Sequence, residues 1–132
     1  MMKTRFDIIK YVATLRENWE KMSQLSNIVC DINYFDARVS VDNYILDYLN
    51  DDDYWQNDDD YNIQSFIEFL INNFTNNIKD NISFYNKHNC YNEKYSGCSD
   101  EYILLFSIVS QKYRPKFHVH QQLLKTAYKI YE

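Results

Sequence analysis

Glycine and proline are almost absent from this sequence, which contains only Gly97 and Pro115 in 132 residues. Average usage would give roughly nine glycines and seven prolines. All-β folds and phosphate-binding loops need glycine for tight turns and for close approach of the backbone, so both lose support. The Walker, Rossmann and serine-hydrolase motifs, which contain glycines, are absent. This scarcity favours an all-α fold with short polar loops.

Cysteines and long apolar runs are also scarce. The three cysteines are an odd number and too few for a disulfide scaffold. No run of about 18 apolar residues offers a transmembrane helix, and the amphipathic start does not resemble a signal peptide. We therefore expect a cytoplasmic protein with reduced thiols and no membrane association. At this length we expect a single helical domain over residues 1–132.

Apolar residues recur at helical spacing along the first half of the chain. One such stripe predicts a helix over about residues 4–28, and its members are Ile8, Val12, Leu15, Trp19 and Met22, widened by Phe6, Ile9 and Leu25. Asn33 and Asp36 then break the pattern. Ser40 is a candidate N-cap for a short helix that ends near residue 49. A third helix is predicted over about residues 63–85.

The second half of the chain predicts two more helices. Ser99-Asp100-Glu101 is a typical helix start before the apolar run 102–109, and Pro115 would end that helix. A last helix carries Leu123, Leu124, Ala127, Tyr128 and Tyr131. The predicted fold is therefore all-α, a compact bundle of about five helices with an acidic loop between helices 2 and 3. We expect the first stripe to pack against Phe66, Leu70, Phe74 and the run 102–109.

The acidic loop is the most informative segment for function. Two copies of Asp-Asp-Asp-Tyr surround a tryptophan, so carboxylates that would attract a basic partner lie beside aromatic side chains that could anchor it. The partner-binding residues that we predict are Asp51, Asp52, Asp53, Tyr54, Trp55, Asp58, Asp59, Asp60 and Tyr61.

Charge is distributed unevenly along the chain. Residues 26–62 hold ten aspartates and Arg38, a net charge of −9, whereas residues 102–131 carry five basic residues and no acid. These two regions could dock on each other within one fold. Alternatively, the acidic region could steer a cationic partner, which accelerates association by ~10–1000-fold.

Other chemistries fit the sequence less well. His88, Cys90, Cys98, His118 and His120 are possible zinc ligands, but they lack the spacing of a zinc finger. The acidic loop has Gln56 and Asn62 where a calcium loop needs Gly and Glu. Lys112-Tyr113-Arg114-Pro115-Lys116-Phe117-His118 alternates basic and aromatic residues as nucleic-acid surfaces do, but it is short in an acidic chain. We expect no cofactor, no metal and no nucleic-acid partner.

In general character the chain resembles small acidic inhibitors, such as immunity proteins that block a toxin's cationic nuclease domain. This resemblance implies a non-enzymatic protein–protein inhibitor whose partner is a basic toxin, nuclease or host factor. Viral inhibitors with a Bcl-2-like helical fold are a second comparison, although Glu17-Asn18-Trp19 lacks the Gly-Arg that follows Asn-Trp in their cellular relatives. The alternatives are thus a helix-groove binder and a small zinc or thiol enzyme.

Overall fold

The computed structural model describes residues 5–52 and 59–109, with the backbone alone over residues 59–64. This part of the chain forms four helices and no strand: α1 (Arg5–Leu25), α2 (Val29–Leu49), α4 (Asp59–His88) and α5 (Glu93–Val109). The all-α prediction is confirmed here. Five helices were predicted and four are described. The helix predicted around Leu123 and the stop at Pro115 lie outside the described residues.

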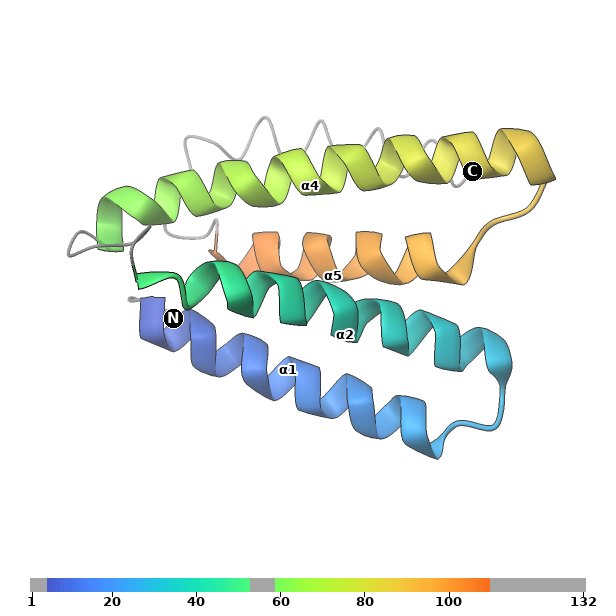
Figure 1. The fold of residues 1–132 in the computed structure, drawn as a ribbon, viewed down its shortest axis with the longest axis horizontal. Coiled ribbons are helices and arrows are strands. Elements are labelled where there is room, and N and C mark those ends of the chain that lie inside the picture. The colour runs from blue at the N-terminus through green and yellow to red at the C-terminus, as the bar shows by residue number, and fades with distance from the viewer. Residues whose placement is uncertain (1–4, 53–58, 110–132) are drawn as a thin grey trace.

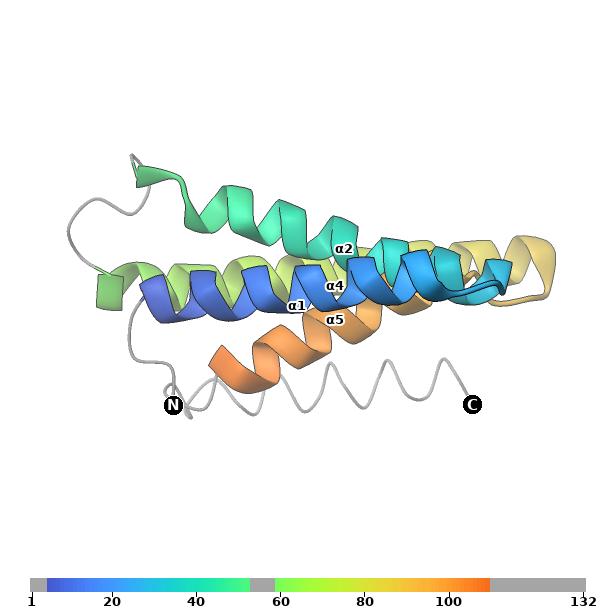
Figure 2. The same cartoon turned by 90° about the horizontal axis from the view of Figure 1, so that it is seen from below.

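Successive helices run in opposite directions along one bundle (Figure 1). α2 and α5 lie between α1 and α4, and from below α2 and α5 lie on either side of α1 (Figure 2). α2 contacts both α1 and α5, and α5 also contacts α4. α2 and α5 are therefore the central pair of the bundle.

Buried apolar side chains from all four helices form one core, which includes Ile8 and Val12 of the predicted α1 stripe, whereas Phe6, predicted to widen that stripe, is 66% exposed. The members of this core are Ile8, Val12, Val41, Ile45, Leu49, Phe66, Ile67, Leu70, Phe74, Ile78, Tyr102, Leu105, Phe106 and Val109. The C-terminal end of the α1 stripe was predicted wrongly, because Met22 is 44% and Leu25 is 82% exposed. The core thus occupies the half of the bundle nearer the start of α1.

The short second helix was also predicted wrongly, because α2 already begins at Val29. Asn33 and Asp36 lie inside it. Ser40 is not an N-cap, and its Oγ donates a hydrogen bond to the carbonyl oxygen of Asp36 at 3.0 Å. The buried face of α2 includes two charged residues, Arg38 and Asp42, at positions where helical spacing suggests apolar side chains. These charges hid the helical pattern.

Helix α5 begins at Glu93, six residues before the predicted start at Ser99. Asn92 caps it, because its side-chain oxygen accepts a hydrogen bond from the backbone N–H of Lys94 at 2.9 Å. The polar residues Ser99 and Glu101 are fully buried inside the helix. Polarity was therefore a misleading sign of a loop in this segment.

In helix α4 the central part of the predicted apolar stripe is buried, but Tyr85 at its end is exposed and the helix starts earlier than predicted. It begins at Asp59, so Asp59, Asp60 and Tyr61 belong to a helix and not to the predicted acidic loop. Carboxylates in a first helical turn are stabilised by the partial positive charge of the helix N-terminus. Asp59 and Asp60 therefore also have a local structural role.

Candidate functional site

Two aspartates of the predicted binding surface lie at the end of α2. Asp51 and Asp52 follow the C-cap residue Asn50 and are both exposed. The Arg5 Nη1 atom donates hydrogen bonds to the Leu49 carbonyl oxygen at 3.1 Å and to Asp52 Oδ1 at 3.3 Å. The Arg5 side chain is 8% exposed, whereas that of Asp52 is 89% exposed. A buried cation thus fixes the point at which the acidic segment leaves the bundle.

The structure brings the two ends of the acidic segment to the same end of the molecule. The end of α2, the start of α4 and the start of α1 lie together there (Figure 1). Asp53, Tyr54, Trp55 and Asp58 lie outside the described residues, so their part in the predicted surface remains a prediction. The segment therefore joins two helices and has a defined start and a defined finish.

The acidic segment starts at the C-terminus of α2 and finishes at the N-terminus of α4, so its two ends lie near helix dipoles of opposite sign. Asp47 is exposed one turn before Asp51, so two carboxylates follow one another at the C-terminus of α2. A helix C-terminus carries partial negative charge, which makes it an unfavourable place for carboxylates. The Arg5 guanidinium partly offsets this repulsion by pairing with Asp52. Helix stability therefore does not explain why carboxylates lie at this end of α2.

A second cluster of functional groups is buried between α1, α2 and α5, and sequence reasoning missed it. Glu101 is fully buried, and its carboxylate is held by donors from two other helices. Arg38 donates to Glu101 Oε1 from Nε at 3.2 Å and from Nη2 at 2.9 Å. Trp19 donates its indole N–H to Glu101 Oε2 at 2.8 Å. Trp19, predicted as an apolar core residue, is therefore a polar partner of Glu101.

Aromatic rings enclose the Arg38 guanidinium. Its central carbon lies 3.9 Å from the centre of the Trp19 ring, which in turn stacks on Phe35. Arg38 Nη1 also donates to the Tyr34 hydroxyl at 3.0 Å, and that hydroxyl donates to Asp100. Burial and then the bond to Asp100 raise the pKa of Tyr34 to about 12. The phenol is therefore kept neutral as a structural donor.

Asp42 completes this cluster from α2. It is fully buried, and burial followed by the adjacent Glu101 raises its pKa to about 10. With both carboxyls ionised, neither oxygen of Asp42 has a hydrogen-bond donor among the described residues. A protonated Asp42 removes this conflict, because its O–H can then donate to the Glu101 carboxylate. The signal for this cluster in the sequence was the pair of charges at core positions of α2.

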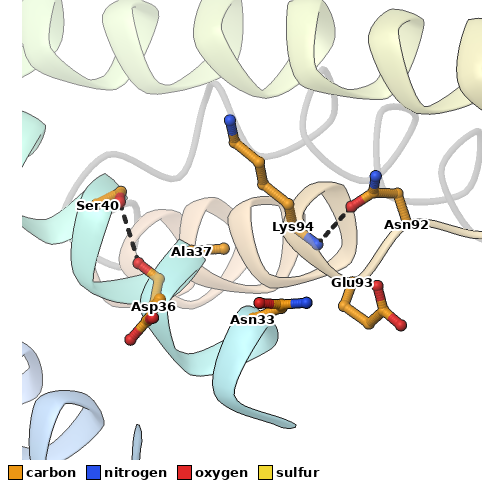
Figure 3. A pocket seen from close by; sticks show the side chains of 7 residues that line it. All are labelled: Asn33, Asp36, Ala37, Ser40, Asn92, Glu93 and Lys94. Atoms are coloured by element: carbon orange, nitrogen blue, oxygen red, sulfur yellow. Dashed lines mark hydrogen bonds between the residues drawn. The ribbon is translucent and has the colours of Figure 1, made fainter. Parts of the chain in front are cut away.

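Two surface hollows on the described helices are lined mainly by polar residues. One of about 400 Å³ lies between the first half of α2 and the start of α5, and it is lined by Asn33, Asp36, Ala37, Ser40, Asn92, Glu93 and Lys94 (Figure 3). Another, of about 390 Å³, is lined by Glu17, Glu20, Lys21 and Gln24 on α1. Neither has the apolar lining that a helix-groove binder requires.

The predicted zinc and thiol residues are only partly described. No three His, Cys, Asp or Glu side chains lie close enough to hold a metal within residues 5–52 and 65–109. His118 and His120 lie outside the described part of the chain. Burial raises the pKa of Cys98, and a hydrogen bond with Glu93 raises that of Cys30. Neither change favours the thiolate that a nucleophilic cysteine needs.

Comparison of the chain with protein-family models, with curated proteins and with solved structures gives no match. Among the described helices, none is both long enough and apolar enough to cross a membrane.

Proposed function

We propose that this protein is a non-enzymatic protein–protein inhibitor that binds a basic partner through the acidic-aromatic segment 51–61. The observation that carries the proposal is the exposed Asp51–Asp52 pair at the end of α2, anchored by the buried Arg5. Carboxylates at a helix C-terminus weaken the helix, so a cationic partner that binds at this end would relieve an unfavourable interaction with the helix dipole. Tyr54, Trp55 and Tyr61 would supply aromatic anchors within the same segment.

The finer proposal is an immunity-type neutraliser of a basic toxin or nuclease. A cleft that binds phosphates presents cations at close spacing, and two aspartate triplets offer carboxylates at a similarly close spacing. Complementary charge of this kind accelerates association and selects the partner. The chain's net charge of −5 suits such steering, because the field of the whole molecule has the same sign as the binding segment.

The test compares two variants of equal charge. The first replaces Asp51, Asp53, Asp58 and Asp60 with asparagine and retains Asp52, which pairs with Arg5. The matched control replaces the exposed Glu17 and Glu20 with glutamine and the exposed Asp31 and Asp80 with asparagine. Each variant loses four negative charges.

The partner is first isolated on immobilised wild-type protein from cells of the native organism, and its association rate is then measured by surface plasmon resonance at several salt concentrations. We expect the first variant to associate at least ~10-fold more slowly at low salt, with a flatter salt dependence. The control should remain close to wild type. Equal rates for the two variants would refute binding through segment 51–61. A salt-independent wild-type rate would instead favour the helix-groove alternative.

A further inference from the structure

Asp42 and Glu101 form a buried pair of carboxyl groups at the contact between α2 and α5, the two central helices. Both residues are 0% exposed. Two negative charges buried side by side repel each other strongly, and burial also disfavours the charged form of each carboxyl group. Only a shared proton or a compensating cation makes such a pair tolerable.

The two arginines near the pair differ, because Arg38 bonds to it directly whereas Arg16 acts through its charge and its buried Nε has no hydrogen-bond partner among the described residues. Arg38 directs two donors at Glu101 and a third at the Tyr34 hydroxyl. Arg16 from α1 acts on Asp42 through its charge, but its Nη1 atom donates to Asn43 Oδ1 at 3.5 Å. One directly bound guanidinium thus faces two carboxyls.

The hydrogen-bond geometry identifies which carboxyl is charged. Glu101 accepts three N–H donors, two on Oε1 and one on Oε2, as a carboxylate does. Asp42 accepts none from the described residues. A carboxylate has about four acceptor positions, so Glu101 can take one more donor. The O–H of a neutral Asp42 supplies a donor of the right kind.

The remaining neighbours come from the helices that pack on this pair. Tyr11 of α1 lies close to the pair, and burial followed by the charge of Glu101 raises its pKa. Tyr34 of α2 and Asp100 of α5 extend the network outwards. Among the described residues, the titratable and charged groups that face the pair are thus Tyr11 and Arg16 from α1, Tyr34 and Arg38 from α2, and Asp100 from α5.

We propose that the bundle is a proton-dependent latch, in which a proton held between Asp42 and Glu101 joins α2 to α5 and is released when the two helices separate. This property goes beyond the proposed binding function. The folded chain takes up a proton that the unfolded chain does not hold at neutral pH. Raising the pH therefore weakens the attachment of α5, and lowering the pH strengthens it.

The direction follows from linkage. The pKa of Asp42 is about 10 in the fold and close to 3.8 in an unfolded chain. Its stabilising contribution is fully present below pH 3.8 and is lost progressively as the pH rises towards 10. Within that window this group raises the unfolding equilibrium constant about tenfold per pH unit. An aspartate in an ordinary ion pair has the opposite effect.

The test uses the full chain and the variant Asp42→Asn, whose amide donates to Glu101 without a titratable proton. Urea unfolding is measured from pH 5 to pH 8. We expect the unfolding constant of wild type to rise about tenfold per pH unit relative to that of Asp42→Asn. Asp47→Asn, at an exposed position of the same helix, should behave as wild type. Parallel curves for wild type and Asp42→Asn would overturn the proposal.

A second measurement needs no folded variant. Infrared spectra of wild type at pH 7 should contain the carbonyl band of a protonated carboxyl group, although exposed aspartates and glutamates are ionised at that pH. Asp47→Asn should retain the band, and Asp42→Asn, where folded, should lose it. Absence of the band in folded wild type at pH 7 would overturn the latch, whatever the unfolding data show.

Discussion

At the scale of single residues, the buried charges of α2 determine how the helices align. Arg38 contacts Trp19 of α1 and Glu101 of α5, so one side chain fixes the position of three helices. Separating a buried ion pair by removing one partner typically costs ~3–5 kcal/mol. A different alignment of α5 along α2 that separated Arg38 from Glu101 would carry a penalty of this order.

Gly97 makes the same helix pair possible by its lack of a side chain. A Cβ atom there would lie 2.9 Å from the Ala37 Cβ and would also collide with the backbone oxygen of Tyr34. We predict that Gly97→Ala lowers the free energy of unfolding by ~1–3 kcal/mol, because the clash outweighs the ~1 kcal/mol that alanine gains in a helix. Urea denaturation measures this difference.

A matched control for that substitution lies on the exposed side of α5. Ser107 is exposed, and its hydroxyl donates to the Ile103 carbonyl within the helix. Ser107→Ala should therefore change the free energy of unfolding by no more than ~0.5 kcal/mol. If Gly97→Ala stabilised the protein, α5 would not lie as close to α2 as described.

At the scale of helices, sequence patterns were reliable where the buried face is apolar. The α4 stripe, with Phe66, Leu70 and Phe74, was predicted from spacing alone and is buried. The run 102–109 was correctly assigned to a helix instead of a strand, because Ser-Asp-Glu precedes it and no strand partner is present in the sequence. In both segments, burial and local periodicity indicate the same structure.

The patterns failed where polar residues are buried. The first half of α2 was predicted as a break at Asn33 and Asp36, and α5 was predicted to begin only at Ser99. Arg38, Asp42 and Ser99 in these two helices are polar residues that are nevertheless buried in the fold. Their partners are remote in the chain, as with Arg38 and Glu101, 63 residues apart. Single-sequence reasoning has no access to such pairing.

Arg5 joins two helices at the acidic end, and its removal provides a test of that junction. Its guanidinium bonds to the last carbonyl of α2 and to Asp52. We predict that Arg5→Ala costs ~1–3 kcal/mol of unfolding free energy, since hydrogen bonds to a charged donor are lost in a buried place. Amide exchange at Asn50 and Asp51 should also accelerate.

The exposed Lys10 on α1 provides the comparison for Arg5. Lys10→Ala removes one positive charge from the same helix, so any general effect of net charge should appear in it as well. We expect wild-type exchange at the end of α2 in that variant. Equal acceleration in both variants would show that charge, and not the Arg5 contacts, holds the end of α2.

At the scale of the whole molecule, the features assigned to stability and to binding lie in different places. The apolar core and the Arg38–Asp42–Glu101 cluster are formed by all four described helices. The proposed binding segment connects the end of α2 to the start of α4 at one end of the bundle (Figure 1). This separation predicts that changes in the segment affect partner binding far more than folding.

The most direct measurement of that central claim is the free energy of unfolding of Trp55→Ala beside that of Trp19→Ala. Trp19→Ala removes a hydrogen bond to Glu101 and the ring over Arg38, so we predict a loss of ~3–5 kcal/mol. Trp55→Ala should change the value by less than ~0.5 kcal/mol while weakening partner binding by more than ~1 kcal/mol. A loss of stability in Trp55→Ala as large as in Trp19→Ala would place Trp55 in the core and contradict the proposed binding surface.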